Sequence, residues 1–419
     1  MPMPEDTVAG LSLRGRRLVD SPPLPEYLRE HFARSVSPFD AASRPDGYIP
    51  MCIAENRLVW DLLRPKMAAC RDVPAGVLHY DAMTGSPLFR QQLAAFMGRT
   101  FLGRRFEPEQ IAVLAGAGSV LEVLFHVLAD PGDRVLVPTP SYAGFWQDLE
   151  TRDELAVVPV HTASADGFRL TTELLDRALA GAGRPVRALL FTSPSNPLGT
   201  VYPPEQVAEV LDWADSAGIH VVFDEIYALS VFGTTAFTSC AAVRHGLGDR
   251  VHIVWAFSKD FAASGLRCGV LVSENEEVQR AVDALAYWSC VSGDTQFLLG
   301  GMISDDAWVD GFLTAMQGRL RTAYRSITSA LDEEGIPFLP AEAGFFLLCD
   351  LRRFLAEPTW DAEHALWRRL LTEANVNLTP GAACRVAEPG FMRLCFAGVP
   401  PETGTVVARR LGRTLRARS

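Results

Sequence analysis

The chain has 419 residues, 48% of them hydrophobic and 21% charged, and its formal net charge is −11 at pH 7. This length predicts two domains of roughly 150 residues or more, or one large domain with a companion, and the composition excludes disordered, fibrous and short disulfide-stapled proteins. The negative charge disfavours nucleic acid as a partner and favours a small molecule. The sequence shows neither an apolar stretch of about 18 residues nor a signal-peptide pattern, so we expect a cytoplasmic protein with no membrane partner.

The cysteines and lysines limit the kinds of site that the chain can form. The 8 cysteines include no C-x-x-C pair, so we expect buried, reduced thiols and no metal site. Of the 39 basic residues only Lys66 and Lys259 are lysines. Arginine-rich codon usage explains the scarcity, but chemistry that needs a primary amine on the protein has only these two candidates.

The middle of the chain alternates short aliphatic runs with longer segments of helical pattern, which predicts βαβ units and a mostly parallel sheet. Each aliphatic run enters a loop rich in Gly, Ser, Pro or Asp, and such loops bind ligands in open α/β sheets. The predicted strands span residues 111–115, 134–138, 186–191, 219–223, 251–257 and 268–273.

After about residue 300 the pattern changes to amphipathic helices flanking short strands, which predicts a smaller α+β domain. The proline-rich first 45 residues are expected to complete it. The predicted helices span 311–333 and 362–374, and the predicted strands span 344–349 and 391–396. We expect an N-terminal arm and part of the small domain over 1–75, a large domain over 76–305, and the C-terminal small domain over 306–419.

Ser258-Lys259-Asp260 follows the predicted strand over 251–257, and Arg267 comes close behind. A lysine in such a loop, partly desolvated and near another cation, can have a lowered pKa and act as a Schiff-base nucleophile. The alternative is a solvated surface lysine, with Ser258 capping the next turn.

Asp224 and Tyr227 follow the neighbouring predicted strand, and Asn196 lies in the proline-fixed loop over 193–200. A carboxylate there can keep a cofactor ring nitrogen protonated, and a phenol can bond a ring oxygen. The amide of Asn196 suits the orientation of a phenolate-like oxygen or a carboxylate. The alternatives are a helix cap for Asp224, a core position for Tyr227 and an ordinary β-turn for Asn196.

Gly116-Ala117-Gly118-Ser119 joins the strand over 111–115 to a helix, an arrangement in which backbone N–H groups and the helix dipole hold a phosphate. Leu121 stands where a dinucleotide fingerprint has its third glycine, so the motif favours a phosphate monoester. Together these motifs require one phosphate, a ring nitrogen, a phenolic oxygen and an aldehyde. Pyridoxal 5'-phosphate has all four.

Residues 45–397 resemble the class I/II aminotransferases, a family of fold type I pyridoxal-phosphate enzymes. The likeness rests on the order of the Asn196-Pro197 loop, Asp224, Tyr227, Ser258-Lys259-Asp260 and Arg267. The resemblance implies an α/β fold in which helices flank a mostly parallel seven-stranded sheet in a large pyridoxal-phosphate-binding domain, with a smaller α+β domain beside it. It also implies a homodimer with shared active sites.

The same resemblance implies a role for each matching residue. Lys259 would form the Schiff base, Asp224 would pair with the pyridine nitrogen, and Tyr227 and Asn196 would contact the ring oxygen. Among the remaining cofactor contacts, Tyr142 would stack on the ring, Arg267 would bind the phosphate, and Tyr80 would reach the phosphate of the partner subunit. The other contacts would come from Ala117, Gly118, Ser119 and Ser258. Arg393 would bind the substrate α-carboxylate.

Within that family the chain is most similar to 1-aminocyclopropane-1-carboxylate synthases, which act on S-adenosylmethionine. Three segments carry this likeness: residues 45–58, 224–232 and 388–397. In those synthases the glutamate of an A-E-N segment lines the substrate site and the alanine amide meets the carboxylate. The likeness therefore assigns Ala54 and Glu55 to substrate binding, together with Tyr80, Asn196 and Arg393.

The chain departs from the pattern at three places. Ala256 stands where the family usually has a serine that reaches the phosphate, a loss of one hydrogen bond of about 1 kcal/mol. Met83-Thr84-Gly85 replaces the Tyr-His-Gly of plant synthases, and Met51-Cys52-Ile53 replaces their Met-Gly-Leu. Both replacements are expected near the substrate, so the product is left open.

We expect Lys259, Asp224, Tyr227 and Glu55 to catalyse α-deprotonation of S-adenosylmethionine and loss of methylthioadenosine by γ-elimination or γ-replacement. Three outcomes stay open: the α-carbon closes a cyclopropane, a vinylglycine-type intermediate is captured by a second small-molecule substrate in bacterial biosynthesis, or that intermediate hydrolyses. The first alternative is an aminotransferase that moves an amino group between an amino acid and a 2-oxo acid. A cofactor-binding protein without catalysis is the second.

Overall fold

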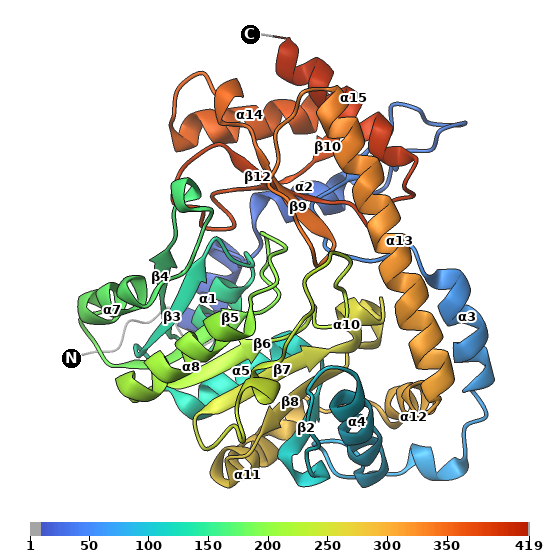
Figure 1. The fold of residues 1–419 in the computed structure, drawn as a ribbon, viewed down its shortest axis with the longest axis vertical. Coiled ribbons are helices and arrows are strands. Elements are labelled where there is room, and N and C mark those ends of the chain that lie inside the picture. The colour runs from blue at the N-terminus through green and yellow to red at the C-terminus, as the bar shows by residue number, and fades with distance from the viewer. Residues whose placement is uncertain (1–9, 418–419) are drawn as a thin grey trace.

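A seven-stranded sheet of order β2-β8-β7-β6-β5-β3-β4 forms the centre of the lower part of the molecule in Figure 1. The computed structural model describes residues 10–417. Only β8 runs antiparallel to its neighbours, so the predicted mostly parallel sheet is confirmed. The strands are β2 (Ile111–Leu114), β3 (Arg134–Thr139), β4 (Ala156–His161), β5 (Val186–Thr192), β6 (His220–Asp224), β7 (Val251–Ala256) and β8 (Gly269–Ser273).

The hydrophobic pattern alone predicted six of these strands and missed β4. This strand lies at the edge of the sheet, where it pairs with β3 only, and most of its residues are half-buried. It also contains Pro159, which lacks a backbone donor and is tolerated at an edge. The seven strands implied by the family resemblance are confirmed.

Helices bury both faces of the sheet, which explains why its central strands are nearly continuous apolar runs. Along β6, Val221 and Phe223 belong to one hydrophobic cluster and Val222 belongs to another, as the period of two in a strand requires. The helices are α1 (Leu13–Asp20), α2 (Glu26–Arg34), α3 (Trp60–Ala69), α4 (Pro87–Thr100), α5 (Ala117–Leu128), α6 (Phe145–Glu150), α7 (Thr172–Gly181), α8 (Pro204–Ala217), α9 (Cys240–Val243), α10 (Phe257–Asp260), α11 (Glu276–Leu285), α12 (Gly293–Ile303), α13 (Asp306–Glu333), α14 (Trp360–Thr372) and α15 (Thr403–Arg416).

A smaller α+β part lies above the large sheet in Figure 1, and the long helix α13 runs along both. It contains an antiparallel sheet of β11 (Thr379–Pro380), β12 (Phe391–Cys395) and β9 (Phe346–Asp350). Near the N-terminus β1 (Ile49–Pro50) pairs in parallel with β10 (Val376–Asn377), so this segment joins the smaller part as expected. The predicted domain boundaries at residues 75 and 305 stay predictions.

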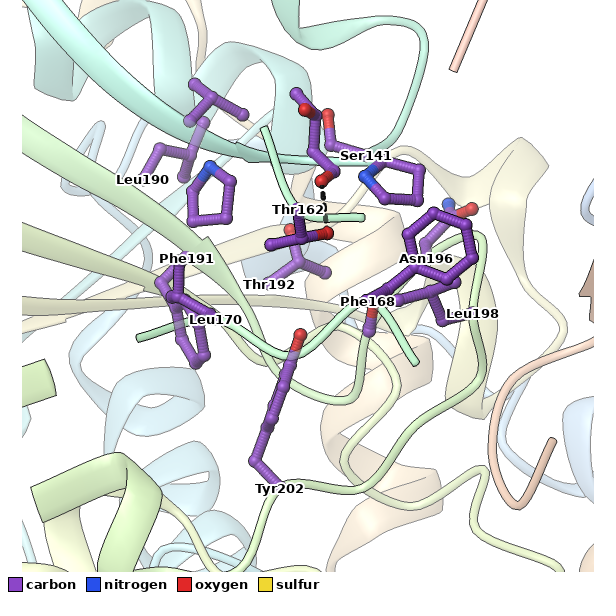
Figure 2. Close-up of a pocket in the computed structure, with 15 residues that line it drawn as sticks. Ser141, Thr162, Phe168, Leu170, Leu190, Phe191, Thr192, Asn196, Leu198 and Tyr202 are labelled. Atoms are coloured by element: carbon purple, nitrogen blue, oxygen red, sulfur yellow. Dashed lines mark hydrogen bonds between the residues drawn. The ribbon is translucent and has the colours of Figure 1, made fainter. Parts of the chain in front are cut away.

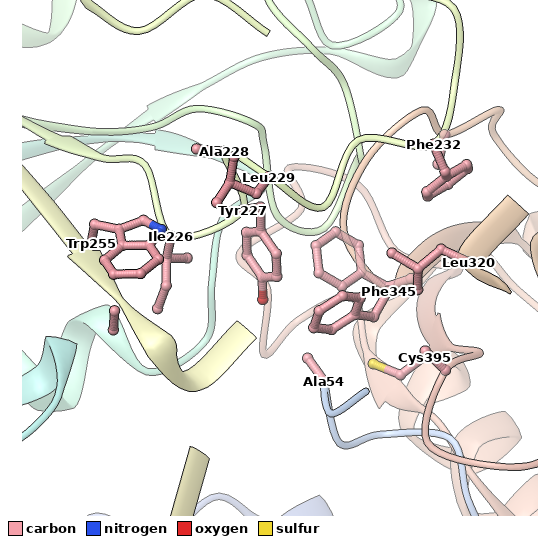
Figure 3. Packing of buried hydrophobic residues seen from close by; sticks show 14 of the residues in the cluster. Ala54, Ile226, Tyr227, Ala228, Leu229, Phe232, Trp255, Leu320, Phe345 and Cys395 are labelled. Carbon is pink, nitrogen blue, oxygen red and sulfur yellow. The ribbon is translucent and has the colours of Figure 1, made fainter. Parts of the chain in front are cut away.

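One hydrophobic cluster connects the two parts. Figure 3 shows the ring of Tyr227 between Ile226 and Trp255 on one side and Phe345 and Cys395 on the other. Because this core is shared, the strand ends of the large sheet and the loops of the smaller part are held at close range.

The cysteines partly depart from the prediction. Six are buried and all eight are unpaired thiols, but Cys290 is exposed and Cys70 is half-buried, so burial was wrongly predicted for Cys290. Within residues 10–417 no helix combines the length and the apolar composition that crossing a membrane demands.

Candidate active site

Lys259 lies in α10, the single helical turn that begins directly after β7. Its Nζ donates a hydrogen bond to the carbonyl oxygen of Ala54 at 2.6 Å, across 205 residues of sequence. Burial lowers the pKa of Lys259 to about 8, and the Arg393 cation lowers it as well. The amine is therefore available as a nucleophile and base near neutral pH. Ser258 does not cap the turn, because the helix begins after Ala256 and has no side-chain cap.

Asp224 ends β6 and is almost completely buried. Its carboxylate accepts a hydrogen bond from the backbone N–H of Ile226 at 3.3 Å, within a turn, so it does not cap a helix. Burial raises the pKa of Asp224 to about 7; the Asp148 carboxylate also raises it, whereas Lys259 lowers it. A cationic group beside this carboxylate is needed to keep it ionised at neutral pH.

Asn196 connects Tyr227 to Arg393. Its Nδ2 donates to the Tyr227 hydroxyl at 3.5 Å, and its Oδ1 accepts from an Arg393 Nη1 at 3.0 Å. Tyr227 packs edge-on against Phe345 and Phe346, so it occupies the core position and also presents its hydroxyl to Asn196. Figure 2 shows Asn196 at the margin of a cavity of about 20 Å³, enough for one water molecule, which Ser141 and other residues line.

Arg393 projects from β12 into this buried region. Its Nη2 donates to the carbonyl of Cys52 at 2.9 Å and to the hydroxyl of Thr379 at 3.1 Å. Within residues 10–417 its buried Nε has no hydrogen-bond partner. An unpaired buried donor costs about 1–3 kcal/mol, so an anionic oxygen of a ligand bound at Nε would relieve this cost.

A second arginine approaches the start of α5. A Cβ added at Gly116, whose φ is +93°, would collide with the guanidinium of Arg267. Arg267 is itself exposed and donates to the carbonyl of Ser264 at 3.0 Å. Ala117, Gly118 and Ser119 form the first turn of α5, so their backbone N–H groups and this cation converge on one place.

Glu55, Tyr142 and Tyr80 were also expected at the site, and the structure places them in different surroundings. Glu55 accepts hydrogen bonds from Arg57 Nε at 3.2 Å and Nη2 at 2.9 Å. Tyr142 follows β3, is 40% exposed and packs edge-on against Phe145. Tyr80 is 95% exposed, and within residues 10–417 no hydrogen bond joins it to the others, so the site of its own chain does not include it.

Comparison with known proteins identifies the family. The family model "Aminotransferase class I and II" matches residues 67–411. The chain is 38% identical to 1-aminocyclopropane-1-carboxylate synthase 6 of Arabidopsis thaliana, over 90% of this chain and 79% of that protein. It is 37% identical to 1-aminocyclopropane-1-carboxylate synthase 3 of Oryza sativa subsp. japonica, over 98% and 95%. The chain belongs to the class I and II aminotransferase family.

The fold agrees with this assignment. The structure superposes on aspartate aminotransferase from Thermotoga maritima with a TM-score of 0.80 and 24% identity, over 97% of this chain and all of that one. The protein is a pyridoxal-phosphate-dependent enzyme of this family, and its sequence is similar to 1-aminocyclopropane-1-carboxylate synthases over most of its length.

The residues present fit pyridoxal phosphate. The close packing of Arg267 on Gly116 at the start of α5 suits a phosphate, and the neutral form of Lys259 is accessible for an aldehyde. Asp224 is a buried carboxylate without a cationic side chain bonded to it in the described residues, which suits a protonated ring nitrogen. Because alanine stands at position 256, Arg267 and the first turn of α5 would hold the phosphate without a serine hydroxyl from that position.

Sequence reasoning missed two carboxylates at this site. Asp260 is buried and accepts hydrogen bonds from the Leu229 N–H, the Ser230 hydroxyl and the Trp255 indole, so it fixes the loop after β6 to α10. Its place next to Lys259 was a usable signal. Asp148 lies on the short helix α6, and burial raises its pKa to about 6. No motif surrounds Asp148, and only the folded chain brings it near Asp224.

Proposed function

We propose that this enzyme acts on S-adenosylmethionine, removes its α-proton and releases methylthioadenosine by γ-elimination or γ-replacement. The observation that carries the proposal is the bond from Lys259 Nζ to Ala54, because it brings the Ala54-Glu55-Asn56 segment to the amine. The synthases at 37–38% identity support it, since that segment is part of the likeness to them.

Pyridoxal phosphate, when bound, supplies an aldehyde for the substrate amine and a ring that stabilises negative charge at the α-carbon. In the proposed reaction Nζ of Lys259 accepts the α-proton. Asp224 holds a proton at the ring nitrogen, and Tyr227 and Asn196 orient the ring oxygen. These residues act as preorganised charges and dipoles, which generally make the largest contribution to catalysis.

The substrate groups are assigned to the other residues. Arg393 binds the α-carboxylate through its free Nε, and the Glu55 carboxylate attracts the sulfonium cation. When the bond between Cγ and sulfur breaks, its electron pair leaves with methylthioadenosine. A new bond from Cα to Cγ gives the cyclopropane, and the α-proton then leaves from Nζ of Lys259 to solvent. In replacement a second small molecule forms the bond to Cγ and loses its own proton, and the α-proton returns from Nζ to Cα; water in that role gives hydrolysis.

We also propose a homodimer in which Tyr80 reaches the phosphate in the partner's site. Tyr80 stands in an exposed apolar surface with Leu78, Leu88, Tyr287 and Trp288, all more than half exposed. Tyr80, Leu88 and Tyr287 line a cavity of about 900 Å³. Large exposed apolar patches mark interfaces between proteins. If the sites are shared, Tyr80→Phe weakens cofactor retention; unchanged retention contradicts the assignment.

An aminotransferase is the second candidate, because the structure matches aspartate aminotransferase in fold and the residues around Asp224 and Lys259 serve transamination equally well. One experiment separates the two. The enzyme loaded with pyridoxal phosphate is mixed with S-adenosylmethionine, and methylthioadenosine and the amino-acid product are measured by mass spectrometry, with Lys259→Ala as the control. Release that depends on Lys259 supports the proposal, and amino transfer to a 2-oxo acid without release supports the alternative.

A further inference from the structure

A separate cavity of about 670 Å³ lies at the edge of the large sheet, outside the residues assigned to the reaction. We call it the edge pocket and define it by Trp146, His161, Trp360 and Arg385, which line it. Residues of β4 and the first residue of α14 line it, and Figure 1 shows β4 at the margin of the large sheet with α14 above it. Cavities of about 300–1,000 Å³ are the size that small-molecule ligands occupy.

The edge pocket offers flat aromatic surface. Trp146 is 9% exposed, and its ring is covered by the Arg385 guanidinium at 4.9 Å. Trp360 is 42% exposed, although it is the first residue of α14 and Thr359 caps that helix firmly. Because Arg385 already covers the Trp146 ring, the exposed indole of Trp360 is the surface suited to stacking against a planar aromatic ring.

The edge pocket also offers one free positive charge. The acid closest in sequence to Arg385 is Glu388, but it pairs with Arg352 at 2.9 Å, and within residues 10–417 no carboxylate pairs with Arg385. Burial and Arg385 lower the pKa of His161, so this imidazole is neutral at pH 7. Glu150 also lines the edge pocket; its Oε1 accepts from the Val157 N–H at 3.4 Å, and its other oxygen can accept from an exocyclic amino group.

The loop that carries Arg385 is held in place rather than loose. Glu363 is buried and accepts hydrogen bonds from the N–H groups of Ala382 at 2.9 Å and Gly390 at 2.6 Å. Arg385 has a φ of +55°, a backbone conformation that residues with a Cβ rarely adopt. The N–H of Ser141 donates to the carbonyl of Cys384 at 2.9 Å, so this loop is joined to the segment before Tyr142.

We propose that the edge pocket binds a nucleotide, with the base stacked on Trp360, an exocyclic amine at Glu150 and the phosphate at Arg385. This goes beyond the proposed reaction, because binding at the edge pocket requires no turnover. Its walls come from α6, β4, the start of α14 and the loop over 382–387, and none of the residues assigned to the reaction lines it, so an occupant lies outside the active site.

The test is calorimetric titration of the enzyme loaded with pyridoxal phosphate, using adenosine monophosphate as the probe. We expect binding by the native chain and an affinity about tenfold lower or weaker still for Trp360→Ala and for Arg385→Gln. Trp360→Phe, which keeps a ring, is expected to retain most of the affinity. Arg325→Gln, which removes an exposed cation on α13, is the matched control and is expected to bind as the native chain does.

Two further titrations show at which site adenosine monophosphate binds. Adenosine is expected to bind at least about tenfold more weakly than the monophosphate, and saturating S-adenosylmethionine is expected to leave monophosphate binding unchanged. Absence of binding by the native chain overturns the proposal, as does unchanged affinity in both Trp360→Ala and Arg385→Gln. Displacement by S-adenosylmethionine overturns it too, because the probe would then occupy the substrate site. None of these outcomes depends on whether methylthioadenosine is released.

Discussion

Two regions of different construction meet at Lys259. The residues proposed to hold the cofactor, which we call the cofactor half, lie at strand ends of the large sheet and are Gly116, Asp224, Tyr227, Lys259 and Arg267. The residues proposed to bind the substrate, which we call the substrate half, are Ala54 and Glu55, from an irregular segment, and Arg393, from β12. Asp224 is 6% exposed, whereas the Glu55 side chain is 35% exposed and pairs with Arg57. In the proposed reaction the rigid sheet would therefore hold the groups that move protons, and a more exposed loop segment would face the leaving group.

Lys259→Ala tests whether the cofactor half and the substrate half both depend on the amine of Lys259. We expect kcat to fall by at least about 10⁴-fold, because the lysine provides both the nucleophile for the cofactor and the base for the α-proton. Lys66→Ala is the matched control, since it removes the only other lysine and breaks an ion pair with Asp305 at 2.7 Å and a contact with the Trp308 ring at 5.5 Å, both away from the site. Steady-state assays of methylthioadenosine release compare the two. Equal activity in the two variants would remove Lys259 from the reaction.

Asp224→Asn weakens the cofactor half alone. We expect kcat to fall by about 10²–10³-fold, the usual effect of removing one preorganised electrostatic partner. Both α-proton exchange in D₂O and methylthioadenosine release should fall together, because both depend on charge stabilisation at the α-carbon. NMR of the recovered substrate measures the exchange. If only one of the two rates falls, Asp224 does not act at the common step.

Glu55→Gln weakens the substrate half alone. We expect methylthioadenosine release to fall by about 10-fold to 100-fold, because an anion facing the sulfonium is lost, while α-proton exchange stays near the native rate. The same two assays report the split. Full retention of methylthioadenosine release counts against the proposed role of the segment around Glu55.

The pH dependence of the reaction between Lys259 and the cofactor shows how strongly each half changes the pKa of this amine. Only the neutral amine attacks an aldehyde, so the rate at which apo-enzyme captures pyridoxal phosphate should rise about tenfold per pH unit up to about pH 8 and then level off. Glu55 and Asp224 both raise the pKa of Lys259, and Glu55 does so more. The pH at which the capture rate levels off should therefore be lower in Glu55→Gln than in Asp224→Asn. Stopped-flow absorbance measures it, and a break that stays fixed in both variants contradicts this electrostatic coupling.

The cofactor half was accessible to prediction from sequence, because buried parallel strands are apolar runs and the polar residues that follow them gather at one edge. Lys259, Asp224 and Gly116 were found in this way. Two features could not be predicted in this way: the hydrogen bond from Lys259 to Ala54, and the bonds from Arg393 to Cys52 and Thr379. In both, the fold brings together residues from separate parts of the chain. Only the family resemblance pointed to Ala54 and Glu55.

The smallest expected effect concerns Arg57, which lies next to the substrate half without belonging to it. Its two bonds hold the Glu55 carboxylate, but both side chains are partly exposed, so solvent screening limits the pair to about 0.2–1 kcal/mol. Arg57→Gln should therefore lower methylthioadenosine release only about twofold to fivefold. In the background of Glu55→Gln it should have no further effect, because the carboxylate that it positions is gone. A double-mutant cycle in kcat/KM measures this coupling, and additive losses would show that Arg57 acts on the substrate independently of Glu55.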